Sequence, residues 1–243
     1  MTNIIIIIGS PRGKKSNSVN AVKQLFCEVD KYTTDYMLDV VYLSERIINE
    51  CCGCLSCFKI CKICPRFHDD VHDIEKKMLG ADLIIWVSPV YAHNVTGIMK
   101  NFIDRISYGL HIFRFIGKFG YVISISASNG NSFVNDYLGK ILLYFGVKVI
   151  DKLSIQTFRG LSEDVLNKHA KQIAGFICGN GYRRTNDFEE KYYIAMKTAL
   201  QEVIKRTETN ETRFWSENDY FNYSSFEELF RIKCTHCSST SLL

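Results

Sequence analysis

Five short apolar runs alternate with amphipathic helical stripes through about residue 180, and this alternation constrains the fold more than any other feature. The apolar runs are residues 4–8, 37–43, 81–87, 121–126 and 147–155. The first is an unbroken series of isoleucines, which is typical of a strand buried on both faces of a parallel sheet. Strict alternation predicts an α/β protein with helices on both faces of that sheet. We therefore expect a doubly wound, five-stranded parallel sheet in the order 2-1-3-4-5.

The chain changes character after this unit. Residues 187–206 carry one amphipathic helical pattern, and residues 207–243 mix aromatic side chains with polar turns. The aromatic content is too high for a disordered linker. We expect one domain over residues 1–180, followed by a helical and aromatic C-terminal extension over residues 181–243 that packs on the domain or on a partner subunit.

Composition excludes several classes of protein. Hydrophobic residues make up 47% of the chain, which is ordinary for a globular protein. The 30 basic and 26 acidic residues are interspersed, so no basic face indicates nucleic-acid binding. No apolar run approaches the roughly 18 residues of a membrane span, and the first residues lack the pattern of a secretory signal. We expect a cytoplasmic protein that binds neither nucleic acid nor membrane.

The loop after the first strand, residues 9–18, offers hydroxyl and amide groups where a helix begins. Ligands of open α/β sheets bind at such strand ends, and a helix N-terminus attracts anions. Only three residues separate Gly9 from Gly13, which fits neither a P-loop nor the dinucleotide fingerprint. The pattern leaves a cradle for a single phosphate, or a simple helix cap by Ser16 or Asn17. The polar candidates for the cradle are Ser10, Arg12, Ser16, Asn17 and Ser18.

A second loop, residues 88–97, follows the third strand at the same point of the sheet. Pro89 fixes the direction of the chain, and Tyr91 offers a flat face to a planar ring. The backbone groups of residues 89–94 can meet the edge of a heterocycle. An ordinary turn with an exposed tyrosine is the alternative interpretation.

Six of the ten cysteines lie between residues 51 and 64. In a cytosolic chain such a cluster favours metal or redox chemistry over disulfides. Cys51, Cys54 and Cys57 are separated by two-residue gaps, which let thiolates converge on one cluster or one metal ion. Three interpretations stay open: a [4Fe–4S] cluster that relays electrons, a structural zinc ion, and cysteines used only for packing or subunit contact.

Taken in chain order, these segments resemble the NAD(P)H-dependent FMN reductase family, which has a flavodoxin-like fold, and its iron–sulfur flavoprotein branch. The matching segments are residues 9–12, 16–18, 51–57, 68–71, 88–91, 100–107 and 117–118. The resemblance implies that FMN is bound, with its phosphate at the cradle and ring contacts from Pro89, Val90, Tyr91 and Asn94. It also implies that the loop at residues 127–131, with Ser128, approaches the ring or the ribityl chain. The branch implies the cluster ligands Cys51, Cys54, Cys57 and Cys64, leaving Cys52 and Cys61 as surplus cysteines.

The implied function is that of a flavin-dependent oxidoreductase. NADH or NADPH would bind transiently and supply electrons that pass through FMN to a quinone, a nitro or azo compound, or another acceptor. The alternative is an iron–sulfur flavoprotein that carries electrons between protein partners without small-molecule turnover. Neither interpretation assigns a catalytic acid or base. The family's tendency to share the flavin pocket between subunits implies a homodimer or a homotetramer.

Overall fold

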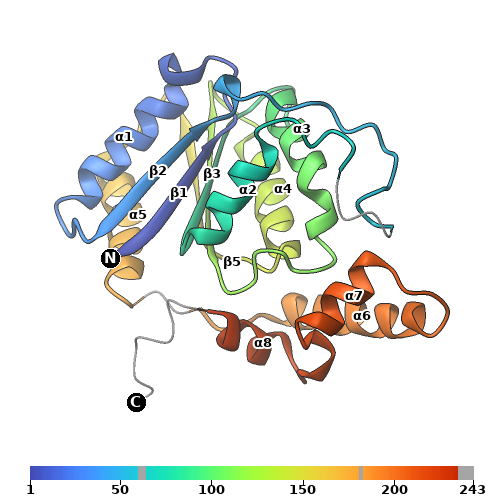
Figure 1. Cartoon of the computed structure of the whole chain (residues 1–243). Helices are drawn as coiled ribbons and strands as arrows, with labels where there is room; N and C mark the ends of the chain where they lie inside the picture. The colour runs from blue at the N-terminus through green and yellow to red at the C-terminus, as the bar shows by residue number, and fades with distance from the viewer. Residues whose placement is uncertain (60–63, 181–182, 235–243) are drawn as a thin grey trace.

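In the computed structural model, which describes residues 1–59, 64–180 and 183–234, a five-stranded sheet forms the centre of the fold (Figure 1). Its order is β2-β1-β3-β4-β5, and every neighbouring pair is parallel. The predicted α/β class and strand order are therefore confirmed. The strands are β1 (Thr2–Ile8), β2 (Tyr36–Tyr42), β3 (Leu83–Pro89), β4 (Phe119–Ser126) and β5 (Lys148–Gln156).

Helices cover both faces of the sheet (Figure 1). On one face α1 (Asn17–Val29) packs beside α5 (Glu163–Ile177). The other face carries α2 (Val71–Gly80), α3 (Gly97–Ile106) and α4 (Asn131–Tyr144). Short 3₁₀ turns lie at η1 (Gly13–Lys15), η2 (Leu43–Glu45) and η3 (Ser107–Gly109). Because each helix returns the chain to the amino edge of the sheet, the loops that follow the strands gather at the carboxyl edge.

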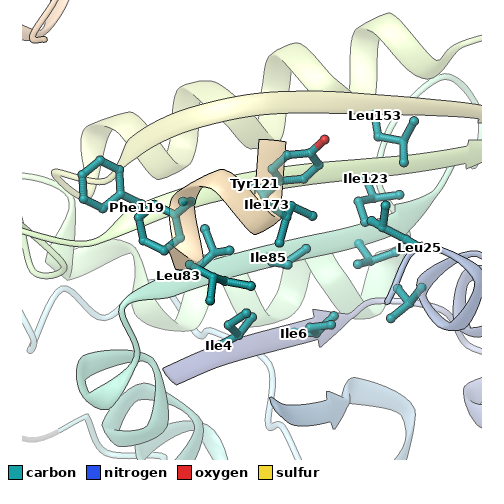
Figure 2. Close-up of a cluster of buried hydrophobic side chains, with 14 of the residues drawn as sticks. Ile4, Ile6, Leu25, Leu83, Ile85, Phe119, Tyr121, Ile123, Leu153 and Ile173 are labelled. Atoms are coloured by element: carbon teal, nitrogen blue, oxygen red, sulfur yellow. The ribbon is translucent and has the colours of Figure 1, made fainter. Parts of the chain in front are cut away.

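The isoleucine run of β1 is buried on both faces. Successive side chains in a strand point to opposite faces, so Ile4 and Ile6 enter the layer under α1 and α5, whereas Ile5 enters the layer under α2, α3 and α4. Figure 2 shows the first of these layers, in which Leu25 of α1 and Ile173 of α5 lie over the sheet. A central strand of a covered parallel sheet needs apolar side chains at every position, which explains the unbroken run.

Beyond α5 the chain forms a helical extension. Its elements are α6 (Asp187–Ile204), α7 (Asn210–Glu217), the 3₁₀ turn η4 (Tyr220–Asn222) and α8 (Phe226–Lys233). The sequence predicts α6 but neither α7 nor α8. Tyr193 stacks on Trp215 with ring centroids 5.7 Å apart, and Phe226 packs against Phe113 of the preceding domain, also at 5.7 Å. Among the described residues, no helix combines the length and apolar character that a membrane crossing requires.

The extension packs at the amino ends of β4 and β5 (Figure 1). Lys148, which begins β5, is fully buried, with Nζ 2.7 Å from the Glu227 carboxylate and 4.2 Å from the centroid of the Phe230 ring. Gly117, just before β4, has φ +83°, and a Cβ atom there would lie 2.3 Å from the carbonyl oxygen of Lys233. The extension is thus fastened to the edge opposite the loops that follow the strands.

Candidate functional site

A cavity of about 190 Å³ opens at the carboxyl edge of the sheet, where the loops after β1 and β3 meet. This is the switch point of the strand order, because β1 and β3 are neighbours whose connections leave on opposite faces. The lining residues are Ser10, Arg12, Ser16, Asn17, Ser18, Pro89, Val90, Tyr91, Ile125, Ser126, Ala127 and Thr157.

The first wall of the cavity is the start of α1. Ser10, Ser16 and Ser18 are buried, with at most 2% of each residue exposed. Ser16 is the N-cap, and its hydroxyl accepts a hydrogen bond of 3.3 Å from the N–H of Val19. The first turn of an α-helix leaves backbone N–H groups without intrahelical partners, and the first turn of α1 contains no acidic residue. With Arg12 at the rim, this wall suits an anion. Ser16 therefore caps α1 and also lines the cavity.

The second wall is the loop after β3. The N–H of Val90 donates to the carbonyl oxygen of Ile125 at 2.7 Å, which fixes the loop against β4. Tyr91 and Asn94 exchange backbone hydrogen bonds of 2.8 and 2.9 Å around a turn in which Ala92 and His93 have φ of 48° and 60°. Non-glycine residues rarely adopt this conformation. The tight turn leaves Tyr91 partly exposed beside the cavity.

Eight of the ten predicted flavin contacts line this single cavity: Ser10, Arg12, Ser16, Asn17, Ser18, Pro89, Val90 and Tyr91. Asn94 and Ser128 are exposed and are not among the lining residues. The side-chain oxygen of Asn94 instead accepts from the N–H of Val95 at 2.8 Å.

The sequence did not single out Ile125, Ser126 or Thr157, which end β4 and follow β5. Their position at the carboxyl edge is the signal that could have found them. Asn131 ties these strand ends together: its side chain accepts from the Ser126 hydroxyl at 2.6 Å and donates to the carbonyl oxygen of Ile155 at 3.2 Å.

The cysteine loop lies between η2 and α2, and its described parts, residues 46–59 and 64–70, extend past α3 (Figure 1). Cys57 and Cys64 line a second cavity, of about 270 Å³, with Asp69, His72, Arg105 and Tyr108 among its other residues. Cys51 and Cys54 are exposed. Cys61, a surplus cysteine in the sequence pattern, lies outside the described residues.

The described thiols influence one another. Burial raises the pKa of Cys57, and Cys64, Cys51 and Cys54 raise it further, so each of these three thiols lies within electrostatic range of Cys57. Hydrogen bonds from Ser56 lower the pKa of Cys54 to about 7. Within the described ranges no three His, Cys, Asp or Glu side chains form a ready metal site. In the described part of the loop, these thiols thus surround Cys57 at electrostatic range without forming a preassembled ligand set.

The sequence matches the model of a protein family described as NADPH-dependent FMN reductase, over residues 2–158. An iron–sulfur flavoprotein of Archaeoglobus fulgidus is 33% identical over 143 residues, and this match covers 58% of the chain but only 62% of the relative. An iron–sulfur flavoprotein of Clostridioides difficile is 29% identical over 177 residues, covering 72% of the chain and 77% of the relative.

Solved structures with the same fold include an apo NADH:FMN oxidoreductase, with a TM-score of 0.54 and 18% identity over 72% of this chain and 89% of that chain. An FMN-dependent NADH-azoreductase from Bacillus anthracis, in complex with FMN, has a TM-score of 0.52 and 14% identity, covering 75% of this chain and 100% of that chain. At such identities the likeness concerns the fold alone.

Proposed function

The chain belongs to the NADPH-dependent FMN reductase family, and from this membership we propose that it is an FMN-dependent NAD(P)H oxidoreductase. Electrons from a nicotinamide would pass through FMN to a quinone, a nitro or azo compound, or another acceptor. The observation that carries the proposal is the cavity at the carboxyl edge of the sheet, which joins the polar start of α1 to the loop of Tyr91.

The first wall has the donor set that a phosphate monoester requires. Hydroxyl groups of Ser10, Ser16 and Ser18 and the amide of Asn17 surround a helix N-terminus, and Arg12 adds a positive charge at the rim. Charge-assisted hydrogen bonds to phosphate oxygens are stronger than those between neutral groups. We assign these five residues to the phosphate of FMN.

The second wall suits a planar ring. Pro89, Val90 and Ile125 present apolar surface, and Tyr91 presents an aromatic face beside it. When bound, FMN would supply the hydride and electron chemistry, whereas the protein supplies binding, orientation and exclusion of water. We therefore assign no side chain as a catalytic acid or base, and we place Asn94 and Ser128 at the outer margin of the ring site.

We propose that Cys51, Cys54, Cys57 and Cys64 hold a [4Fe–4S] cluster. Four cysteine thiols in one loop, three of which act electrostatically on Cys57, have the donor chemistry of such a cluster, and the names of the curated relatives include iron–sulfur. A cluster would supply one-electron transfer. Because Cys51 and Cys54 are exposed, the second candidate function is an electron carrier that docks protein partners at this loop.

We also propose a cytoplasmic homodimer or homotetramer. Three large aromatic side chains around the cavity are exposed: Tyr91 lines it, Phe133 packs on His93 beside Tyr91, and Phe158 follows Thr157 of the lining, at 48%, 59% and 89% exposure respectively. Exposed apolar groups that cluster at one edge are typical of an interface. Light scattering with and without FMN measures the oligomeric state, and a monomer at all concentrations would contradict this part of the proposal.

Anaerobic purification followed by absorption spectroscopy tests the function directly. Bound flavin gives two visible bands, and a cluster adds a broad shoulder that dithionite bleaches. Oxidation of NADH or NADPH with menadione or ferricyanide then separates an enzyme, which turns over small acceptors, from a carrier, which does not. A protein that stays colourless after incubation with FMN, iron and sulfide would overturn the proposed function.

A further inference from the structure

One guanidinium group closes the base of the cysteine loop. Arg105, in the last turn of α3, is only 7% exposed. Its Nη1 donates to the carbonyl oxygen of Asn49 at 2.7 Å, and its Nη2 donates to that of Arg66 at 2.8 Å. Both nitrogens also donate to the Asp69 carboxylate. A single side chain therefore holds segments on both sides of the cysteines, which we call the neck of the loop (residues 47–49 and 66–70).

Other hydrogen bonds also hold the neck, and none of them uses the Nε–H group of Arg105. The Asp69 carboxylate also accepts from the N–H of Asn49 at 2.9 Å, and Asn101 donates to the carbonyl oxygen of Ile48 at 3.0 Å. The N–H of Ile47 donates to Asp70 at 2.7 Å. The neck is thus fixed by several independent hydrogen bonds.

The Nε–H group of Arg105 is buried and has no hydrogen-bond partner among the described residues. Such a group is rare in proteins, because a buried donor without an acceptor is destabilising. Arg105 lines the same cavity as Cys57 and Cys64. The Cys64 thiol is close enough to contribute to the raised pKa of Arg105. A thiolate sulfur at Cys64 is therefore the natural acceptor for the remaining donor.

We propose that Arg105 is a positioning residue of the cysteine loop, whose Nε–H donates to the Cys64 thiolate when the loop holds its cluster, and that this contact raises the reduction potential of the cluster. The inference rests on the proposed [4Fe–4S] site. Reduction adds one electron and makes or breaks no covalent bond, so it adds negative charge to the sulfur ligands. A hydrogen bond from a cation to a ligand sulfur stabilises that added charge.

The matched variants are Arg105→Lys and Lys100→Gln. Lysine keeps the positive charge and reaches Asp69, but it lacks the Nε–H group and the planar fork. Lys100 is half-exposed, pairs with Asp104 and lies near Cys51, so its removal deletes a charge near the loop but no contact of the neck. The reconstituted full chain is titrated with dithionite while electron paramagnetic resonance follows the reduced cluster.

In Arg105→Lys we expect the reduction equilibrium to shift about tenfold toward the oxidised form, which is about 59 mV for one electron, with iron content retained. In Lys100→Gln the shift is smaller, because water screens the exposed charge. An unchanged potential in Arg105→Lys would overturn the inference and leave the proposed function intact. Wild-type protein that binds FMN but no iron would overturn both the cluster and this inference.

A second test uses the wild-type chain and therefore does not depend on whether a variant folds. Protein labelled with ¹⁵N-arginine is reconstituted and reduced, and hyperfine spectroscopy looks for coupling between the cluster and an arginine nitrogen. We expect a resolved ¹⁵N coupling, since a donor nitrogen in contact with a ligand sulfur shares its spin density. Absence of any coupling in a fully loaded sample would contradict the proposed contact.

Discussion

Thr96 joins the two loops that line the cavity at the carboxyl edge of the sheet: its hydroxyl donates to the carbonyl oxygen of Gly9 at 2.5 Å. The same hydroxyl accepts from the N–H of Met99 at 3.2 Å and caps α3. Close packing adds to this link, because a Cβ atom on Gly9 would lie 2.7 Å from Cβ of Met99. This buried hydroxyl group thus ties the loop after β1 to the start of α3, in addition to the hydrogen bond of 2.8 Å from the N–H of Gly9 to the carbonyl oxygen of Val87.

We expect Thr96→Val to destabilise the protein by about 2 kcal/mol, because α3 loses its cap and a buried carbonyl loses its donor. Affinity for FMN falls as well, since the two walls lose their link. Denaturant unfolding and a flavin titration measure the two effects. Thr96→Ser, which keeps the hydroxyl, is the control. Wild-type affinity in the valine variant would show that the link does not matter for the ligand.

The phosphate wall is tested by comparing two helix caps. Ser16 caps α1 inside the cavity, and Ser162 caps α5 with the same hydrogen bond of 3.3 Å, but Ser162 is not among the residues that line the cavity. We expect each change to alanine to cost about 1 kcal/mol of stability. Only Ser16→Ala should weaken FMN binding, by roughly tenfold, because it also removes a hydrogen bond to a charged group. Equal affinity in the two variants would argue against the cradle.

Acidification should loosen the C-terminal extension. Burial alone would raise the pKa of Glu227, but hydrogen bonds from Lys148, Arg231 and Thr185 outweigh it and hold that pKa below its ordinary value of 4.5. The carboxylate therefore contributes stability that is present above about pH 4.5 and is lost as the pH falls through the lowered pKa. Hydrogen exchange in α6 and α8 between pH 6 and pH 3 measures the loss. In Glu227→Gln the pH dependence should flatten, and an unchanged profile would exclude Glu227 as its source.

Alanine substitutions at Gly117 and Gly160 distinguish the cost of a positive φ from the cost of a steric clash. Both have positive φ, +83° and +73°, but a Cβ atom at Gly117 would collide with the backbone of Lys233, whereas one at Gly160 meets no atom of the described residues within 4 Å. We expect Gly160→Ala to cost about 1 kcal/mol and Gly117→Ala about 3 kcal/mol, because α8 must shift. Thermal unfolding measures both. Similar costs would mean that α8 is not held at Gly117.

The sequence predicts the sheet and most of the residues that line the cavity at its carboxyl edge, because both depend on local patterns. An apolar run such as residues 4–8 specifies a doubly covered strand, and polar groups directly after such a strand lie at its carboxyl end. The sequence does not predict that Thr157 and Ile125 line the cavity, because their position there depends on the register between neighbouring strands. Pro89 pairs with Ile125 across β3 and β4, and no local pattern encodes that pairing.

The extension and the cysteine loop depend on features that no local sequence pattern encodes. Helices α7 and α8 have eight residues each, too few turns for a helical period to stand out among aromatic side chains that pack in several directions. The cysteine spacing indicates that thiols can converge, but it says nothing about Arg105, which reaches the neck from α3. A contact of 36 residues along the chain, from Asp69 to Arg105, is fixed by tertiary packing.

Helix α3 connects two sites: Thr96 caps its first turn beside the cavity at the carboxyl edge, and Arg105 lies in its last turn at the neck of the cysteine loop. The two are nine residues apart, about 14 Å along a helix axis at 1.5 Å per residue. With the proposed FMN and iron–sulfur cluster bound near its two ends, this helix would act as a spacer of fixed length between electron donor and electron acceptor. The rate of electron tunnelling falls exponentially with the distance between donor and acceptor. A fixed helix would keep this distance, and therefore the rate of electron transfer within the protein, nearly constant while the surrounding loops move. Evolution could then change the rate mainly through the difference in reduction potential between the two groups.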